Sequence, residues 1–159
     1  MTKQALPPDE MVNPSVQHTH ITLLTLTAQH PRWADCRRIR QQVFIEEQQV
    51  PEALEWDAAD ASATHLLACV QGQAVGCARV LPDSHIGRMA VLAAWRGRGI
   101  GEALLMQAIQ CCQLQGAQYA RLSAQTHAIG FYTQAGFTVC SAPYMDAGIP
   151  HVDMQLELV

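Results

Sequence analysis

Glycine and arginine alternate in a short turn at residues 96–101, which reads Arg-Gly-Arg-Gly-Ile-Gly. Glycines let the backbone approach a ligand closely and present consecutive N–H groups, and the two arginines add positive charge. An apolar stretch at residues 86–92 precedes the turn, and the pattern after it predicts an amphipathic helix over residues 100–115. Free N–H groups and the positive dipole end of that helix would face the same ligand. The turn therefore predicts a binding site for a phosphate or pyrophosphate group.

The spacing of the glycines decides which kind of phosphate loop this is. A Walker loop requires a Lys-Ser/Thr pair after its last glycine, and here Glu102 follows. The dinucleotide pattern Gly-x-Gly-x-x-Gly lacks its last glycine, which would be Glu102 counted from Gly97 or Leu104 counted from Gly99. The pattern that fits is Arg-x-x-Gly-x-Gly, starting at Arg96. It resembles the acetyl-coenzyme-A pyrophosphate loop of the GNAT superfamily of N-acyltransferases.

A second segment supports this resemblance. Residues 125–137 read Gln-x-x-Ala-x-x-Phe-Tyr-x-x-x-Gly-Phe and are similar to a GNAT segment that begins with asparagine, so Gln125 stands where the family has Asn. Three further stretches, at residues 40–51, 55–68 and 148–154, look like the ElaA/YjcF-like branch of the superfamily. The natural acceptors of that branch are poorly known, so the resemblance supplies candidate site residues without naming an acceptor.

The order of predicted elements agrees with the same family. Strands are expected at residues 21–27, 65–70, 74–81, 86–92, 119–124, 137–141 and 152–158, and helices at residues 32–47, 100–115 and 128–134. Residues 48–63 are expected to be irregular, and residues 71–73 to form a tight hairpin turn. This order predicts an α/β (α+β layered) GNAT acyl-CoA N-acyltransferase fold, with a mixed, mostly antiparallel sheet and helices on both faces. We expect a flexible arm at residues 1–17 and one GNAT acetyltransferase domain at residues 18–159.

Composition limits the possible partners. The net charge of −4 argues against nucleic-acid binding and mildly favours cationic substrates such as amines. No apolar run is long enough to cross a bilayer, and residues 1–30 show no secretory signal. The six cysteines form no Cys-x-x-Cys pair, which indicates reduced core or near-core thiols in a cytoplasmic protein. Pairing of sheet edges in a homodimer is compatible with such a fold, but the oligomeric state stays open.

Acetyl transfer to an amine requires an acid for the leaving thiolate. Tyr132 is the candidate, because a phenol with an ordinary pKa of about 10 can protonate a thiolate when it is well positioned. In the resembled family a tyrosine at this place faces the coenzyme sulfur. Packing between helix and sheet is the alternative role for Tyr132.

The transfer also requires a base, and the sequence offers two candidates. Glu47 ends the first predicted helix, and His151 begins the last strand. Histidine titrates in the required range, whereas Glu47 would need burial to raise its pKa or would act through water. An exposed carboxylate and a structural histidine are the alternatives. Asp57 could bind a cationic acceptor or cap a loop.

The resemblance implies a set of coenzyme-binding residues: Met89, Ala90, Val91, Arg96, Gly97, Arg98, Gly99, Ile100, Gly101 and Gln125. The expected activity is N-acetyl transfer from acetyl-CoA to a primary amine of a small molecule or peptide, directly within a ternary complex. The alternatives are a coenzyme-A-binding sensor without transfer activity, and an enzyme of this fold with a longer acyl donor. No metal is expected, since His18 and His20 have no partner ligands at suitable spacing.

Overall fold

The computed structural model describes residues 20–159, and an eight-stranded sheet forms its centre. The strands are β1 (Thr22–Leu26), β2 (Thr64–Val70), β3 (Gln73–Val80), β4 (His85–Val91), β5 (Tyr119–Gln125), β6 (Thr138–Val139), β7 (Tyr144–Asp146) and β8 (Ile149–Glu157). They lie in the order β1-β2-β3-β4-β5-β8-β6, and β7 also pairs with β8. The β4–β5 pair is parallel and all the other pairs are antiparallel. The sheet is therefore mixed and mostly antiparallel, as predicted.

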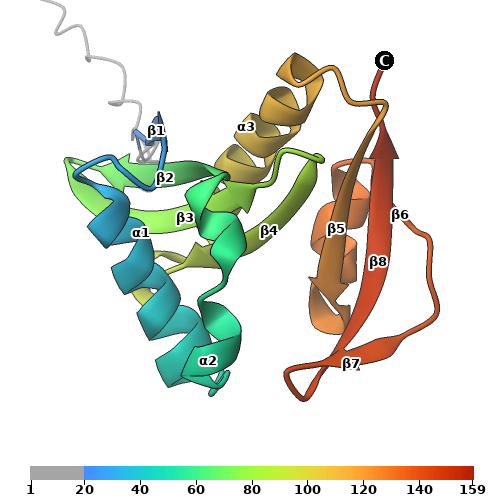
Figure 1. The fold of residues 1–159 in the computed structure, drawn as a ribbon, viewed down its shortest axis with the longest axis horizontal. Coiled ribbons are helices and arrows are strands. Elements are labelled where there is room, and N and C mark those ends of the chain that lie inside the picture. The colour runs from blue at the N-terminus through green and yellow to red at the C-terminus, as the bar shows by residue number, and fades with distance from the viewer. Residues whose placement is uncertain (1–19) are drawn as a thin grey trace, which may run out of the picture.

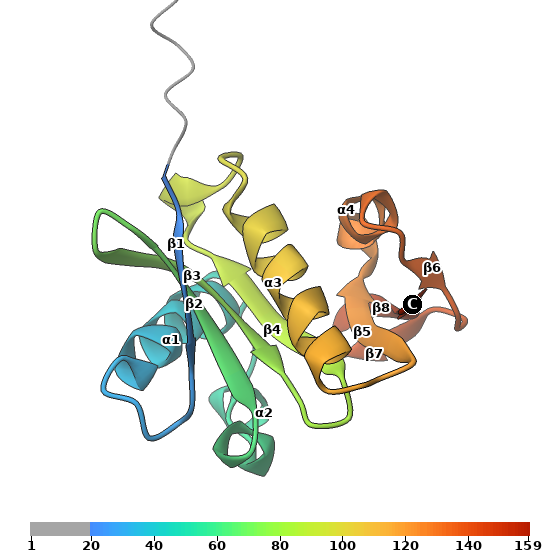
Figure 2. The same ribbon diagram turned by 90° about the horizontal axis from the view of Figure 1, so that it is seen from above.

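Helices cover both faces of the sheet (Figure 2). They are α1 (Trp33–Arg40), the π-helix η1 (Gln41–Glu47), α2 (Glu52–Glu55), α3 (Ile100–Leu114), α4 (Ile129–Gln134) and the short 3-10 turns η2 (Ala58–Ala61), η3 (Ala93–Trp95) and η4 (Thr126–Ala128). One buried cluster joins α1 and η1 to the sheet through Cys36, Ile39 and Val43. A larger cluster joins α3 to the opposite face. The two-faced arrangement confirms the predicted fold class.

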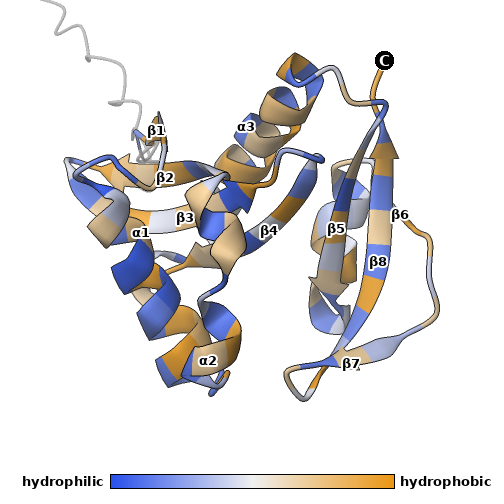
Figure 3. Ribbon diagram, in the orientation of Figure 1, coloured by the Kyte–Doolittle hydropathy of each residue, from blue (hydrophilic) through white to orange (hydrophobic). Residues whose placement is uncertain are grey.

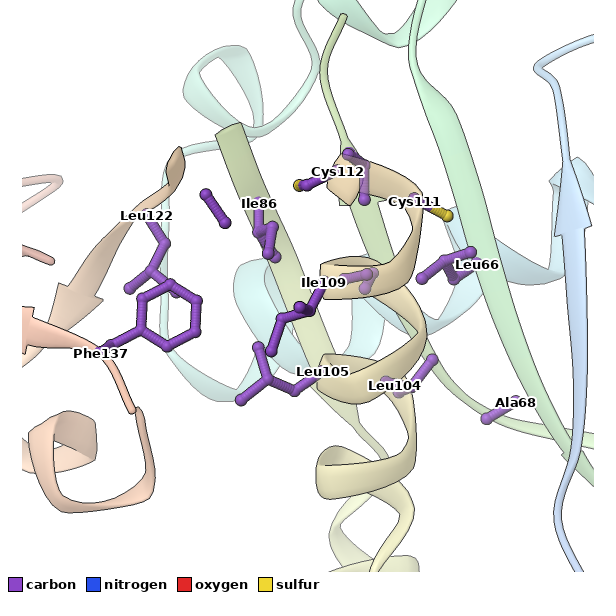
Figure 4. Packing of buried hydrophobic residues seen from close by; sticks show 14 of the residues in the cluster. Leu66, Ala68, Ile86, Leu104, Leu105, Ile109, Cys111, Cys112, Leu122 and Phe137 are labelled. Atoms are coloured by element: carbon purple, nitrogen blue, oxygen red, sulfur yellow. The ribbon is translucent and has the colours of Figure 1, made fainter. Parts of the chain in front are cut away.

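Helix α3 is held by an apolar stripe, as its sequence period predicts. In Figure 4, Leu105 and Ile109 lie toward Ile86 and Phe137 from other elements, and Leu104 lies on the side of Ala68. Along β5 and β8, hydrophobic and hydrophilic residues alternate (Figure 3), so one face packs on this core and the other faces solvent. Burial of this stripe fixes the position of α3, whose first residues, Ile100 and Gly101, are also the last residues of the glycine-rich turn.

Strands β4 and β5 pair only at their beginnings and then separate (Figure 1). Their register contains two matched pairs, His85 with Arg121 and Ile86 with Leu122. Beyond them β4 carries a bulge opposite β3, and Arg88 adopts a left-handed φ of 48°. A bulge bends a strand and redirects its side chains, and a non-glycine residue with positive φ is uncommon. The divergence leaves the β5-facing edge of the β4 backbone without a paired strand near Met89, while the other edge still pairs with β3.

Several local expectations need correction. The predicted helix at residues 32–47 is an α-helix followed by a π-helix, and the irregular segment 48–63 contains the short helices α2 and η2. Arg40, in the helix expected at residues 32–47, is a buried charge that pairs with acidic residues of the segment 48–63. Cys140 is exposed, whereas the other five cysteines are buried free thiols. The predicted strand 137–141 is only the two-residue β6, and the chain between it and the last strand contains the additional strand β7.

Candidate active site

A cavity of about 520 Å³ lies where β4 and β5 separate. Residues of η1, α2, β4, β5 and α4 line it, and the β7–β8 hairpin closes one side. This hairpin turns through Ala147 and Gly148, which both have positive φ and lie between the paired residues Asp146 and Ile149. One wall of the cavity thus comes from β4 and another from β5 and β8.

The glycine-rich turn lies beside the cavity at the start of α3. Gly97 and Gly99 have φ of 76° and 81°, which side-chain-bearing residues rarely adopt, and a Cβ atom at either position would meet nothing within 4 Å. The turn thus leaves open space above its backbone and in front of the first N–H groups of α3. Arg98 lies over the ring of Trp95 at 4.8 Å. Open backbone at a helix start with arginines nearby is the arrangement that a pyrophosphate-binding turn requires.

Arg96 of this turn is joined to the end of η1. Its Nη1 and Nη2 donate hydrogen bonds of 2.8 Å to the two carboxylate oxygens of Glu47, and its Nε donates to the carbonyl oxygen of Val91 at 3.0 Å. The hydrogen bonds from Arg96 lower the pKa of Glu47. This direction is opposite to the one that a carboxylate needs in order to act as a base near neutral pH.

Two amide side chains meet across the cavity. Gln125 Nε2 donates to Gln48 Oε1 at 2.9 Å, and Gln48 Nε2 donates to Gln125 Oε1 at 3.4 Å. Gln125 ends β5 and Gln48 directly follows η1, so the pair links the two elements. Both residues line the cavity.

Tyr132 lies on α4 with its ring against the core and also lines the cavity. Its ring makes edge contacts with Phe131 and Phe137 at centroid distances of 5.1 and 6.1 Å. Burial raises the pKa of Tyr132 to about 12. Its hydroxyl group therefore stays protonated at neutral pH and is available as a donor.

His151 presents one ring nitrogen to the cavity. Its Nδ1 lies 2.6 Å from the carbonyl oxygen of Ile149, and since a carbonyl can only accept, Nδ1 carries the proton. Nε2 is then the basic nitrogen and has no hydrogen-bond partner within residues 20–159. The ring of Tyr144 stacks on the imidazole at 6.1 Å, and the Tyr144 hydroxyl donates to Asp153 at 2.6 Å and also contacts Ser123. These contacts hold the imidazole in one orientation.

A network of six charged side chains lies beneath α2 and η2. Its arginines are Arg40, Arg79 and Arg88, and its acids are Glu55, Asp57 and Asp60. Arg40 and Glu55 are 1% and 3% exposed and pair at 2.7 Å. Asp57 accepts from Ala59 N–H as the cap of η2 and pairs with Arg79 at 2.8 Å.

Sequence reasoning did not assign Glu55 or Arg88 to the site, yet both line the cavity. The acidic spacing from Glu55 through Asp57 to Asp60 was the available signal, but only the folded chain shows which arginines those acids face. Burial raises the pKa of Glu55.

The candidate residues fall into two groups relative to the cavity. Those on its wall are Glu47, Met89, Ala90, Val91, Arg96, Gln125, Tyr132 and His151. Those outside its wall are Gly97, Arg98, Gly99, Ile100 and Gly101, which form the adjoining turn, and Asp57, which belongs to the ion-pair network. The acid candidate and both base candidates thus share one cavity.

Within residues 20–159 no group of three or more His, Cys, Asp or Glu side chains could hold a metal ion, and His18 lies outside the described part of the chain, as does the arm expected at residues 1–17. None of the helices in the described residues combines the length and apolarity needed to span a membrane.

Comparison with known proteins places this geometry in a family. The sequence profile described as "Acetyltransferase (GNAT) domain" matches residues 18–158. The uncharacterized N-acetyltransferase YjcF of Bacillus subtilis is 34% identical over 125 residues, covering 76% of this chain and 89% of YjcF. The crystal structure of Escherichia coli ElaA has a TM-score of 0.78 at 27% identity, covering 87% of this chain and 100% of ElaA. An acyl-CoA N-acyltransferase from Pseudomonas aeruginosa has a TM-score of 0.77 at 28% identity, covering 86% and 99%.

The chain belongs to the GNAT family of acetyltransferases, and its relatives YjcF and ElaA confirm the predicted branch. It is an acyltransferase of the family fold, in which acyl-CoA is the donor and an amine is the acceptor. The predicted class of enzyme is thereby confirmed.

Proposed function

We propose that this protein transfers the acetyl group of acetyl-CoA to a primary amine of a small molecule or peptide, directly and within a ternary complex. The observation that carries the proposal is the cavity between the diverging β4 and β5, which contains a protonated phenol, a basic imidazole nitrogen and free backbone beside an open glycine-rich turn. Positioning two reactants in such a site can lower the barrier by on the order of 7–11 kcal/mol.

The coenzyme would lie along the open turn and the free edge of β4. N–H groups of the turn and of the first turn of α3 bind the pyrophosphate, with Arg98 and Arg96 adding positive charge. Backbone groups of residues 89–91 bind the pantetheine arm, and one N–H there polarises the thioester carbonyl. Gln125 contacts the same arm after it exchanges its hydrogen bonds with Gln48.

His151 serves as the general base. Its Nε2 accepts a proton from the acceptor ammonium, and its Nδ1 remains bonded to the Ile149 carbonyl, which stabilises the cation that forms. Glu47 is the weaker candidate, because its bond to Arg96 lowers its pKa. We assign Glu47 to positioning Arg96.

Tyr132 serves at the leaving sulfur. A phenol with a pKa of about 12 is a weaker acid than a thiol with an ordinary pKa of about 8.5. Complete proton transfer from Tyr132 to the thiolate would therefore cost about 5 kcal/mol. The hydroxyl group therefore acts first as a hydrogen-bond donor to the developing thiolate, and the proton follows when the product separates.

Direct transfer is favoured over a covalent acyl-enzyme. Burial raises the pKa of Cys36 to about 12 and that of Cys77 well above its ordinary value, so neither thiol is an available nucleophile. No cysteine lines the cavity within the described residues. The buried free thiols are also consistent with a reducing compartment, and we propose the cytoplasm.

The first experiment measures the thermal stability of the purified protein with acetyl-CoA, coenzyme A, ATP or NAD. A ligand at one hundred times its Kd adds about 2.7 kcal/mol, which is an easily measured shift. Stabilisation by both coenzyme species but not by NAD supports the coenzyme site. Acetylation of any member of an amine panel then supports transfer, whereas coenzyme binding without transfer would favour the alternative of a coenzyme-A sensor. No thermal shift with either coenzyme species at millimolar concentration would contradict both the acetyltransferase and the coenzyme-A sensor.

A further inference from the structure

Arg88 is the positively charged side chain on the β4 wall of the cavity. The bulge in β4 and the left-handed φ of 48° place this residue out of the regular alternation of the strand. Such a conformation costs free energy in a residue with a side chain, so the surrounding contacts must stabilise it. Arg88 lines the cavity, and its side chain is 25% exposed.

The contacts of Arg88 hold the guanidinium by one edge. Nη2 donates to the carbonyl oxygens of Leu54 and Glu55 at 3.3 and 3.1 Å and to Asp57 Oδ2 at 3.3 Å. Nε lies 3.2 Å from Glu55 Oε1, which is an ion-pair contact without hydrogen-bond geometry. The planar group is therefore fixed on the side of α2 and η2.

The opposite corner of the guanidinium remains available. Within residues 20–159, Nη1 of Arg88 has no hydrogen-bond partner, and this atom is not fully buried. An arginine held on one edge, with donors left over in a reactant cavity, is preorganised for an anion. The neighbouring carboxylates of Glu55 and Asp57 disfavour a doubly charged phosphate there but tolerate a single carboxylate.

The two walls of the cavity carry different groups. In the network on the Arg88 wall three arginines and three acids formally cancel, and Nη1 of Arg88 is a donor without an acceptor within residues 20–159. On the other side of the strand divergence, His151 and Asp146 of the β7–β8 hairpin line the cavity. One wall thus suits a carboxylate and the other suits an amine.

We propose that Arg88 binds a carboxylate of the acceptor, so that the acceptor is a small molecule bearing both an amine and a carboxylate, such as an amino acid. This inference rests on the proposed acetyl transfer, because it specifies the acceptor of that same site. The cavity of about 520 Å³ must hold both the acyl end of the donor and the acceptor, which also favours a small acceptor.

The test compares matched acceptors with and without the carboxylate. Acetylation by the full-length protein is measured for the twenty common L-amino acids and for their C-terminal carboxamides. For the accepted amino acids we expect kcat/KM to exceed that of the carboxamide by about tenfold or more. Arg88→Gln should raise the KM of the amino acid about tenfold and leave that of the carboxamide within about twofold. Arg88→Lys should restore part of the difference.

Arg121→Gln is the matched control, because Arg121 lies on β5 outside the cavity wall and should alter neither KM. The acetyl-CoA-dependent thermal shift of each variant shows whether it is folded. Equal efficiency with acid and carboxamide, or an equal effect of Arg88→Gln on both, would overturn the inference while leaving acetyl transfer intact.

Failure of the proposed function has a different outcome, in which no amine of either set is acetylated although acetyl-CoA binds. In that case the inference is tested by the binding of amino acids and their carboxamides, measured as thermal stabilisation. Amino acids should stabilise the coenzyme-bound protein more than their carboxamides do, and Arg88→Gln should remove that difference. Stabilisation by neither set, or by both sets equally, would overturn it.

Discussion

The carboxylate of Glu47 and the guanidinium of Arg96 form two parallel hydrogen bonds of 2.8 Å across the mouth of the cavity. Glu47 ends the π-helix, and Arg96 begins the glycine-rich turn, so the pair joins elements 49 residues apart in sequence. Both side chains remain more than 40% exposed, so solvent screens the pair and its contribution to stability is small. Its main consequence is chemical, because it keeps Glu47 ionised and Arg96 oriented.

Removing each base candidate in turn distinguishes the two. We expect His151→Gln to lower kcat/KM by about a hundredfold, because the variant lacks the free ring nitrogen. Glu47→Gln should lower kcat/KM much less, since Arg96 already lowers the pKa of Glu47 and makes it a weak base. Steady-state rates of both variants measure the two effects. A large loss in Glu47→Gln alone would assign the base to Glu47.

Removing one hydroxyl group tests the role at the sulfur. Tyr132→Phe should lower kcat by about tenfold or more, with little change in the Kd of acetyl-CoA, because the ring contacts with Phe131 and Phe137 are kept. Turnover measurements and calorimetric titration of acetyl-CoA check the two expectations. Phe131→Leu is the companion variant, since it perturbs the same packing without touching the hydroxyl. Unchanged turnover in Tyr132→Phe would leave Tyr132 with a packing role only.

The close approach of α3 to the sheet depends on Gly76 of β3. A Cβ atom there would lie 3.1 Å from the Ala90 carbonyl oxygen, from Ile100 Cγ2 and from Leu104 Cδ1. We expect Gly76→Ala to reduce the free energy of unfolding by about 1–3 kcal/mol, because the backbone oxygen cannot move away easily. Urea unfolding measures this value.

Gly87→Ala is the control for Gly76→Ala, since an added Cβ at residue 87 would meet nothing within 4 Å. Its free energy of unfolding should stay the same or rise slightly. Equal destabilisation by both variants would show that strand propensity, and not the helix contact, limits residue 76.

Buried His65 should make stability depend on pH. Its ring contacts the ring of Trp33 at a centroid distance of 4.0 Å and a tilt of 43°, its Nε2 lies 3.0 Å from the Asp60 carbonyl oxygen, and burial lowers its pKa. The unfolded chain, with an ordinary histidine pKa of about 6.5, therefore binds this proton more readily than the folded chain does. The contribution of His65 is complete above about pH 6.5 and is lost as the pH falls toward its lower folded-state value.

Urea unfolding between about pH 8 and pH 5 measures this dependence. We expect His65→Gln to flatten the curve, whereas the exposed-site variant His85→Gln should leave its slope unchanged. A curve of the same slope in His65→Gln would show that other groups cause the acid sensitivity.

Local patterns sufficed for the main elements and for the conformation of the glycine-rich turn. The apolar period of residues 100–115 and the alternation in the last strand predicted α3 and β8, because each pattern reports which face an element buries. The glycine spacing indicated the turn for a similar reason, since the positive φ angles of Gly97 and Gly99 restrict the residues that can form it. These features depend on residues that are close together in the chain.

The acceptor side depended on contacts between distant segments. Sequence patterns left Arg40, Glu55 and Arg88 unassigned, whereas folding brings α1, α2 and β4 together into one ion-pair network. The bulge at Arg88 and the free Nε2 of His151 likewise arise from strand pairing and hairpin geometry. A residue type and its spacing determine what a side chain can do, but only the tertiary structure decides which partners satisfy it and which donors remain for a substrate.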